Sequence, residues 1–231
     1  MAGDDSKPRA TFEVEAVSIR LTGGPVAGID EAGRGPLAGP VVAAAVILDP
    51  ERIPSGIADS KTLEPEVREE LFAQIMATSR VGIGVASVAR IDRYNILNAT
   101  LWAMRQAFRQ LDPKPRVALV DGNRPPKLSC DTQCIVEGDA KCLSIAAASI
   151  IAKVTRDRMM VELGRAFPGY GFERHKGYST PEHFAAINRL GVTKHHRRSF
   201  RPVQVALGLV PPDELEVAQL LPGFDPISDQ P

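Results

Sequence analysis

The sequence contains acidic residues whose carboxylates could act together on a substrate. These are Asp30, Glu31, Asp121 and Asp139. An acid at the end of an apolar strand is costly unless it is solvated, paired or metal-bound. Carboxylates suit hard cations, and two Mg²⁺ or Mn²⁺ ions can activate water and stabilise the leaving oxygen of a phosphodiester. Together the acids predict such a metal site. Each acid alone is better explained by a structural role, and Asp139 could be a helix N-cap.

Asp30 and Glu31 present a geometric problem for a shared site. Neighbouring residues of a strand point to opposite faces of its sheet. Both carboxylates can reach one site only if the strand ends or bulges between them. The segment Gly33-Arg34-Gly35-Pro36, which follows almost directly, makes such a break plausible.

The turn formed by Gly33, Arg34 and Gly35 is a candidate for substrate binding. It matches neither G-x-G-x-x-G, because Gly39 comes one residue too late, nor the phosphate loop G-x-x-x-x-G-K-[ST]. Residues without a Cβ allow peptide groups to approach a ribose 2′-hydroxyl, the group that distinguishes RNA from DNA. Arg34 could engage phosphate. The alternative is an ordinary tight turn.

A basic segment near the C-terminal end could contact nucleic acid. The formal net charge is zero, yet residues 153–201 hold 11 Lys or Arg and 4 Asp or Glu. Tyr178, beside Lys176 in a glycine-flanked loop, could stack on a sugar or base. The alternatives are a loop tyrosine packed on its neighbours and a solvated, charge-balanced surface. The candidate phosphate contacts are Lys153, Arg156, Lys176, Arg197 and Arg198. Lys153 and Arg156 could equally well pair with Asp157 and Glu162 at helical spacing.

Hydrophobic periodicity predicts the elements that position these residues. Apolar runs indicate strands over 26–30, 40–48, 81–88, 117–120 and 134–136. Helical spacing indicates helices over 62–77, 91–111, 140–166, 181–190 and 203–221, the last interrupted at Pro211-Pro212. This order predicts an α/β fold, a mixed sheet flanked by helices. We expect a disordered lead over 1–11, a single domain over 12–220 and a flexible tail over 221–231.

Composition excludes several classes of protein. With 44% hydrophobic and 24% charged residues the chain is typical of a globular protein. Three cysteines without a C-x-x-C pair argue against zinc or disulfides and favour a reducing cytoplasm. The start lacks the apolar core of a signal peptide, and the longest uncharged run, residues 35–48, is too short to span a bilayer. We expect a cytoplasmic protein that does not contact membranes and is a monomer.

Ordered segments of the chain resemble the ribonuclease HII family, the type 2 ribonucleases H. The longest runs from Gly28 to Pro40, Gly-Ile-Asp-Glu-Ala-Gly-Arg-Gly-Pro-Leu-Ala-Gly-Pro. The others, in order, are Asp59-Ser60-Lys61, Val120-Asp121-Gly122, Gly138-Asp139-Ala140-Lys141, Ala152-Lys153-Val154-Thr155-Arg156-Asp157, Gly169-Tyr170-Gly171-Phe172, His175-Lys176-Gly177-Tyr178 and His196-Arg197-Arg198-Ser199-Phe200. They span about residues 26–202, roughly three quarters of the chain.

The resemblance implies a ribonuclease H-like fold with a C-terminal helical extension. It implies that the acids named above bind Mg²⁺ or Mn²⁺, and that Gly33, Arg34 and Gly35 recognise the 2′-hydroxyl. Tyr178 would pack on the neighbouring deoxyribose, and Lys61 and Lys176 are further expected substrate contacts. The substrates would be RNA–DNA hybrids and ribonucleotide-containing duplex DNA, cut 5′ to a ribonucleotide to leave a 3′-hydroxyl and a 5′-phosphate. The implied role is ribonucleotide excision and removal of RNA from hybrids.

Two other functions compete with this hypothesis. A catalytically silent hybrid-binding protein is disfavoured because the acids expected to bind metal are intact. Another two-metal nuclease, such as a resolvase or an integrase-like enzyme, would still cut when the ribonucleotide is replaced by a deoxyribonucleotide.

Overall fold

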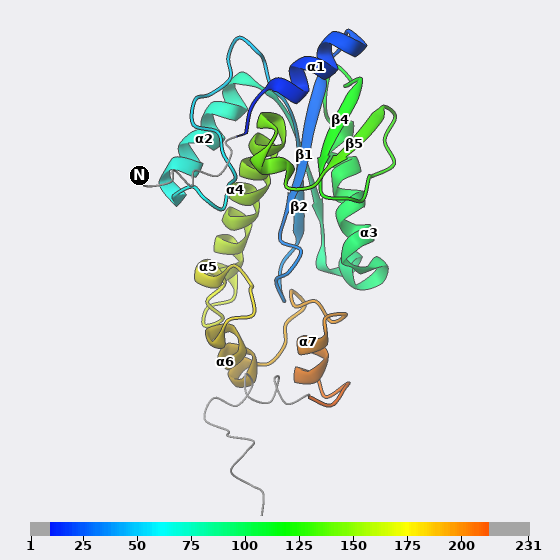
Figure 1. Ribbon diagram of the computed structural model, residues 1–231. Coiled ribbons are helices and arrows are strands. Elements are labelled where there is room, and N and C mark those ends of the chain that lie inside the picture. Colours follow the sequence, from blue (N-terminus) through cyan, green and yellow to red (C-terminus); the bar gives the residue numbers. More distant parts are fainter. Residues whose placement is uncertain (1–9, 213–231) are drawn as a thin grey trace, which may run out of the picture. The chain divides into compact units, whose positions relative to one another are not determined.

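The computed structural model describes residues 10–212 and contains a five-stranded mixed sheet (Figure 1). The strands are β1 (Val26–Ala32), β2 (Val41–Ile47), β3 (Arg80–Ala86), β4 (Val117–Asp121) and β5 (Asp131–Ile135). Their order across the sheet is β3-β2-β1-β4-β5. β1 pairs antiparallel with β2 and parallel with β4, so the expected mixed sheet is confirmed.

The helices lie before, between and after these strands in the sequence. They are α1 (Glu13–Thr22), α2 (Pro65–Thr78), α3 (Val88–Arg109), the 3-10 turn η1 (Gly138–Ala140), α4 (Leu143–Ala166), α5 (Phe172–His175), α6 (Pro181–Leu190) and α7 (Arg201–Ala206). The described residues form two compact units. The sheet unit comprises residues 10–32, 41–86 and 100–155, and the helical unit comprises 33–40, 87–99 and 156–212.

Helices lie on both faces of the sheet in the sheet unit, with α2 and α4 on one side and α3 on the other (Figure 1). Alternation along β3 explains this arrangement. Val81 and Ile83 pack into the apolar cluster that α2 and α4 form with β2. Gly84, the residue after Ile83, faces α3, where a Cβ would lie 2.0 Å from the carbonyl oxygen of Ala103. The glycine therefore allows the backbone of α3 to approach the sheet closely.

The helical unit has an apolar core of its own. Leu37, Phe184, Ile187 and Val203 form one buried cluster, and a second contains Met160 and Phe172. Residue 37 belongs to the glycine-rich turn segment, so this segment is anchored within the unit. The N-cap of α6 is Thr180, whose hydroxyl accepts from the backbone N–H of His183 at 3.2 Å.

Several element boundaries differ from the expected ones. α2 begins at Pro65 rather than at Thr62, whose hydroxyl instead donates to the carbonyl of Asp59. α3 is kinked at Asn95, a residue with φ 63° and ψ 166°. α7 ends at Ala206, well before the expected end at 221, and residues 213–221 lie outside the described part. The short helices α1 and α5 were not expected.

The expected division into lead, body and tail stays a prediction. Residues 1–9 and 213–231 are not described. Of the expected lead, Ala10 and Thr11 are described, and the backbone of Thr11 pairs with that of Lys141 and Leu143.

Candidate active site

The carboxylates expected to act together all belong to the sheet unit. β1 and β4 are parallel, and Ile29 lies opposite Val120, so the next residues, Asp30 and Asp121, are level at the carboxyl edge of the sheet. The backbone N–H of Gly138 donates to Asp121 Oδ1 at 2.7 Å. This hydrogen bond attaches η1, and with it Asp139, to the end of β4.

The expected break between Asp30 and Glu31 is wrong. β1 continues to Ala32, and its register with β2 is regular, with Asp30 opposite Ala44 and Glu31 opposite Ala43. Continuous pairing with β2 leaves no place for a bulge, so the two side chains leave β1 on opposite faces. β1 ends one residue after Glu31, and the charge of Glu31 still raises the pKa of Asp30, so the two carboxylates remain within electrostatic reach of each other without a break. Asp30 Oδ1 accepts from the backbone N–H of Glu31 at 2.6 Å.

Asp30 is the most perturbed of these acids. Its side chain is buried, with 5% of the residue exposed. Burial raises its pKa well above the ordinary value, and the charges of Glu31, Asp121 and Asp139 raise it further against the opposing hydrogen bond from Glu31. The expected residues therefore interact electrostatically around a buried carboxylate, as a cation site requires.

Lys61 and Asp59 lie beside Asp139. Lys61 Nζ is 3.3 Å from Asp139 Oδ2, although the lysine side chain is 78% exposed. Burial opposes protonation of Lys61, but Asp139 and Asp59 outweigh it and raise the lysine pKa. Burial and Asp59 raise the pKa of Asp139, partly offset by Lys61. No role for Asp59 was expected from the sequence, although the segment Asp59-Ser60-Lys61, which contains it, was among those that pointed to the family.

The donor set at this edge fits a hard cation. The charges of Glu31, Asp121 and Asp139 act on the buried carboxyl of Asp30, and a divalent cation would offset both its burial and these like charges. Within residues 10–212, no group of three His, Cys, Asp or Glu side chains is arranged to hold a metal by itself. Mg²⁺ is commonly held by one or two carboxylates, with water and substrate phosphate completing its coordination.

The glycine turn in the helical unit is held by buried arginines. Arg197 donates from Nη1 to the carbonyl of Arg34 at 2.7 Å and from Nη2 to that of Gly33 at 2.5 Å. Its Nε donates to the carbonyl of Gly39 at 3.0 Å. Arg156 Nε donates to the carbonyl of Pro40 at 3.0 Å. Arg156 and Arg197 were expected to contact phosphate. That expectation is wrong, because both are fully buried.

Tyr178 lies beside this turn and is 44% exposed. A Cβ on Gly35 would be 3.9 Å from its ring, and the Arg156 guanidinium lies 5.9 Å from the ring centroid. The aromatic face is therefore adjacent to the expected 2′-hydroxyl site. Lys176 is half-buried, with its backbone in the left-handed region and its ammonium donating to the carbonyl of Glu173.

A buried histidine network lies behind Tyr178 and was not expected from the sequence. Thr193 N donates to His196 Nδ1 at 3.0 Å, which leaves the proton of His196 on Nε2. That Nε2 lies 3.1 Å from His183 Nε2, and His183 Nδ1 lies 2.9 Å from the carbonyl of Tyr178. These contacts are consistent with two neutral histidines. His196 Nε2 donates to His183 Nε2, and His183 Nδ1 donates to the backbone carbonyl of Tyr178. Spacing in sequence alone gave no signal for this network.

The histidine network predicts a loss of stability in acid. Burial lowers the pKa of His183 and His196 to about 4. Between pH 6.5 and 4 the unfolded chain binds protons that the folded chain excludes, so the free energy of unfolding should fall by up to about 1.4 kcal/mol per pH unit for each histidine. Urea unfolding at several pH values would measure this slope. H196N should flatten the slope, and an unchanged slope would contradict the assignment.

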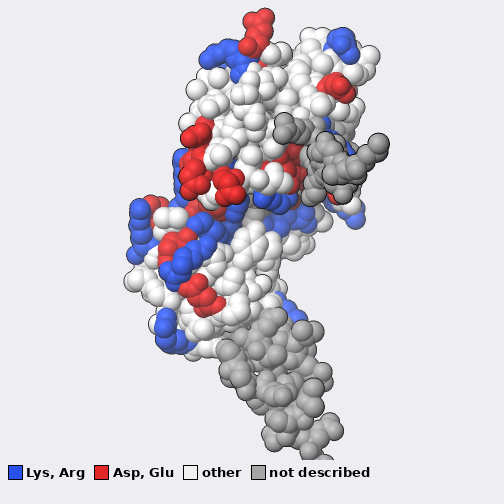
Figure 2. All heavy atoms as spheres, turned by 60° about the vertical axis from the view of Figure 1, so that its left-hand side comes forward, with Lys and Arg blue, Asp and Glu red and all other residues white. Residues whose placement is uncertain are grey.

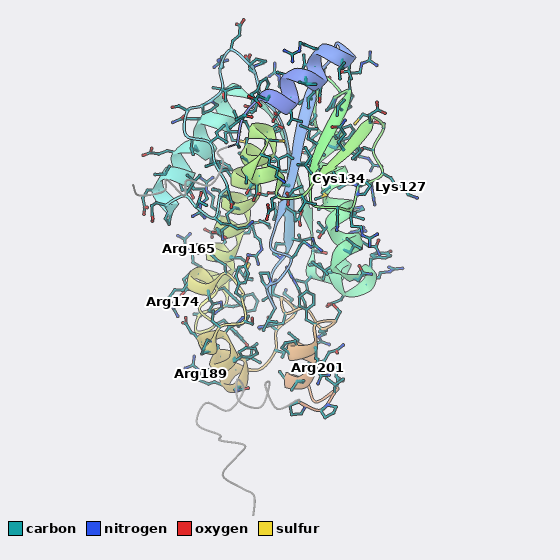
Figure 3. All side chains as sticks on the ribbon, viewed as in Figure 1. Lys127, Cys134, Arg165, Arg174, Arg189 and Arg201 are labelled. Atoms are coloured by element: carbon teal, nitrogen blue, oxygen red, sulfur yellow. The ribbon has the colours of Figure 1, made fainter. Side chains whose placement is uncertain are left out.

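The basic segment does not form a single-sign surface. On the face shown in Figure 2, Lys and Arg side chains lie among Asp and Glu. In the helical unit, Arg165 pairs with Glu162 at 2.5 Å, and Arg174 pairs with Glu173 and Glu182. Arg165, Arg174 and Arg189, labelled in Figure 3, are exposed. Part of the surplus positive charge counted in the sequence is therefore buried or paired.

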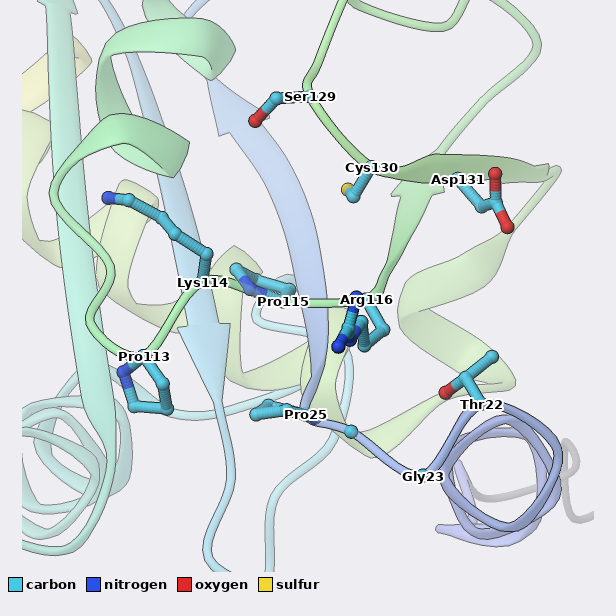
Figure 4. A pocket seen from close by; sticks show the side chains of 11 residues that line it. Thr22, Gly23, Pro25, Pro113, Lys114, Pro115, Arg116, Ser129, Cys130 and Asp131 are labelled. Atoms are coloured by element: carbon cyan, nitrogen blue, oxygen red, sulfur yellow. The ribbon is translucent and has the colours of Figure 1, made fainter.

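A cavity of about 690 Å³ lies at the opposite edge of the sheet from the acids (Figure 4). Pro25, Arg116 and Cys130, which immediately precede β1, β4 and β5, belong to its lining. The ammonium of Lys114, another lining residue, donates hydrogen bonds to the carbonyls of Arg109 and Leu111. The cavity contains none of the expected site residues. Among the described helices, none is long and apolar enough to cross a membrane.

Comparison with known proteins identifies close relatives. A family model described as Ribonuclease HII matches residues 27–203. The ribonuclease HII of Azorhizobium caulinodans is 58% identical over 194 residues, covering 84% of this chain and 75% of the relative. That of Bradyrhizobium diazoefficiens is 59% identical over 198 residues, covering 86% of this chain and 76% of the relative.

Solved structures share the fold. The ribonuclease H2 of Pyrococcus horikoshii has a TM-score of 0.67 at 29% identity, covering 79% of this chain and 96% of that chain. Bst-RNase HIII in complex with Mn²⁺ has a TM-score of 0.66, covering 84% of this chain and 73% of that chain. At 20% identity, the second structure supports the fold alone.

The sheet order, the helices on both faces and the carboxylates at the sheet edge define a metal-dependent nuclease of the ribonuclease H fold class. Within that class, the chain belongs to the ribonuclease HII family. It is accordingly an endonuclease that acts on the RNA strand of RNA–DNA hybrids and depends on divalent metal ions.

Proposed function

We propose that this protein cuts 5′ to single ribonucleotides embedded in duplex DNA, as well as along the RNA strand of hybrids, leaving 3′-hydroxyl and 5′-phosphate ends. Its cellular role would be ribonucleotide excision. The observation that carries the proposal is the buried carboxylate of Asp30 within the electrostatic reach of Glu31, Asp121 and Asp139. Such an arrangement is unfavourable for folding, and a cation bound to phosphate would compensate it.

We assign separate roles to the residues of the sheet unit. Asp30, Glu31, Asp121 and Asp139 would hold Mg²⁺ or Mn²⁺, which when bound supplies Lewis acidity for water activation and leaving-group stabilisation. Asp121 also holds the N–H of Gly138, which keeps η1 against β4. Lys61, an exposed ammonium 3.3 Å from Asp139, is suited to attract and orient a substrate phosphate.

The helical unit would supply selectivity for RNA. Arg197 and Arg156 hold the carbonyls of the turn, so the backbone at Gly33, Arg34 and Gly35 is preorganised to meet a 2′-hydroxyl. Arg34 and Lys176 are proposed phosphate contacts at its margin. Tyr178 would stack against the sugar of the adjacent nucleotide.

A single-ribonucleotide duplex tests the proposed function. The purified protein is incubated with duplex DNA that contains one ribonucleotide, with Mg²⁺, Mn²⁺ or chelator. We expect a single cut 5′ to the ribonucleotide with either metal and none with chelator. An all-DNA duplex of the same sequence is the control. Cutting of the all-DNA duplex would indicate another two-metal nuclease, and binding without cutting would indicate a silent hybrid-binding protein.

Substitution of Tyr178 tests its stacking role. Y178A is expected to lower kcat/KM on the single-ribonucleotide duplex by about tenfold, in the range of a lost base–aromatic contact. Y178F should retain most of the activity, because the ring is kept. Y94A is a matched control, because Tyr94 is also 44% exposed and also lies beside arginines. Equal activity of Y178A and Y94A would contradict the role.

A further inference from the structure

The N-terminus of α4 is capped from another helix. α4 begins at Leu143, immediately after the segment that carries Asp139, and has no acidic residue in its first turn. Glu15 of α1 accepts from Ser144 N at 2.7 Å and from Ser144 Oγ at 2.7 Å, both with Oε1. Asp139, which the sequence suggested as a possible N-cap, instead accepts from Lys61. Glu15, rather than Asp139, therefore supplies the acceptor that caps the N-terminus of α4.

The same N-terminal segment also holds the chain between Asp139 and α4. Thr11 N donates to the carbonyl of Lys141 at 3.1 Å, and Leu143 N donates to the carbonyl of Thr11 at 3.1 Å. Together with Glu15, these contacts hold residues 141, 143 and 144 against a segment that lies about 130 residues earlier in the sequence. We name Thr11, Glu15, Lys141, Leu143 and Ser144 the N-terminal clamp.

The clamp lies opposite a second anchor. On one side of Asp139, Gly138 N is bound to Asp121 Oδ1 at 2.7 Å. On the other side, the backbone of Ser144 lies directly over β1, where a Cβ on Gly28 would be 2.1 Å from the carbonyl carbon of Ser144. Gly28 precedes Asp30 by two residues on the same strand. Asp139 therefore lies between two fixed points of the chain. Gly138 is hydrogen-bonded to β4, and Ser144 contacts β1 and is hydrogen-bonded to α1.

We infer that Glu15 is a positioning residue: by fixing the first turn of α4 through Ser144, it sets Asp139 at the distance from Asp30 and Asp121 that a divalent cation needs. This inference rests on the proposed metal role of Asp139. Glu15 is 1% exposed, and its second carboxylate oxygen, Oε2, is buried without a hydrogen-bond partner. Burying an unpaired carboxylate oxygen costs free energy. An interaction between the carboxylate and the positive N-terminal end of the α4 dipole would offset this cost.

A purely structural role makes a different prediction. If Glu15 only held α1 against the rest of the sheet unit, any substitution that weakens this packing to the same extent would change stability and Mn²⁺ affinity in the same way. Ile19, on the same helix, packs against an apolar cluster formed by β1, β4 and the start of α4, and it makes none of the hydrogen bonds of the clamp. I19A is therefore the matched control for the stability of α1.

The test is the affinity for Mn²⁺, measured by electron paramagnetic resonance of the free ion without substrate, alongside the free energy of unfolding. E15A is expected to raise the Mn²⁺ dissociation constant by about tenfold, the lower end of the range for loss of a direct hydrogen-bond partner of a metal ligand, because Glu15 acts on Asp139 through Ser144. E15Q keeps an acceptor for Ser144 and should fall between E15A and the unchanged protein. I19A should lower stability and leave Mn²⁺ affinity unchanged.

The outcomes separate the inference from the proposed function. Unchanged Mn²⁺ affinity of E15A, or an equal loss in I19A, overturns the positioning role. D139N calibrates the experiment. If D139N itself leaves Mn²⁺ affinity unchanged, the proposed metal role of Asp139 fails. If D139N weakens Mn²⁺ binding and E15A does not, the inference about Glu15 alone fails.

Discussion

D30N is expected to abolish cleavage and at the same time to make the metal-free protein more stable. Loss of a carboxylate from the cation site should lower kcat by at least about 10³-fold, since a bound metal contributes several kcal/mol to transition-state stabilisation. The amide of asparagine is nearly isosteric and carries no charge. It therefore removes the burial cost and the repulsion from Glu31 and Asp121.

The direction of the stability change follows from the raised pKa of Asp30. A carboxyl whose pKa is higher in the folded than in the unfolded state favours folding when it is protonated. This contribution is fully present below the ordinary aspartate pKa and is lost as the pH rises through the folded-state pKa. At neutral pH the metal-free protein bears the cost, and D30N should relieve it with a rise in Tm of a few degrees, about what ~1 kcal/mol produces.

Divalent metal should reverse this ranking. Mn²⁺ is expected to bind the folded protein and stabilise it, whereas D30N lacks one of the expected ligands and should gain less. The measurement is thermal unfolding of both proteins with chelator and with Mn²⁺. D131N is the control, because Asp131 is exposed and begins β5 at the opposite edge. A D30N protein that cuts at the unchanged rate, or whose metal-free stability falls, would contradict this account of the site.

The placement of Asp30 and Asp121 at one edge of the sheet could be predicted because it depends on local patterns. Apolar runs that end in Asp30 and Asp121 indicate strands, and parallel strands place their carboxyl ends at one edge of a sheet. The break expected between Asp30 and Glu31 failed because pairing with β2 is a long-range property that outweighs the nearby glycines.

The supporting residues could not be predicted because their partners are distant in sequence. A count of basic residues does not distinguish an exposed lysine from Arg156 or Arg197, whose guanidinium groups bind carbonyls more than 100 residues away. For the same reason, a single glutamate near the N-terminus gave no sign that Glu15 caps α4. Capping is easily recognised within a helix but not when another element supplies the acceptor.

R197M is the second substitution with a large expected effect, and it acts on the helical unit. Arg197 is fully buried and donates to the carbonyls of Gly33, Arg34 and Gly39. Burial and the charge of Arg156 lower its pKa to about 9, so the guanidinium remains charged at neutral pH. Methionine fills similar space but leaves these carbonyls without a donor. The free energy of unfolding should fall by about 3 kcal/mol or more, since each such hydrogen bond to a charged group contributes ~1.5–3 kcal/mol.

The functional consequence of R197M should be a loss of selectivity rather than of metal binding. Without the hydrogen bonds from Arg197 to its carbonyls, the glycine turn is no longer preorganised. The preference for a ribonucleotide over a deoxyribonucleotide should therefore fall, while Mn²⁺ affinity in the sheet unit should stay unchanged. R197K tests the geometry, because lysine keeps the charge but lacks the planar fork and should recover little. The adjacent, exposed Arg198 provides the control, and R198M should change stability by less than about 0.5 kcal/mol. If R197K matched the unchanged protein in both stability and selectivity, positive charge alone would suffice and the fork would have no role in shaping the turn.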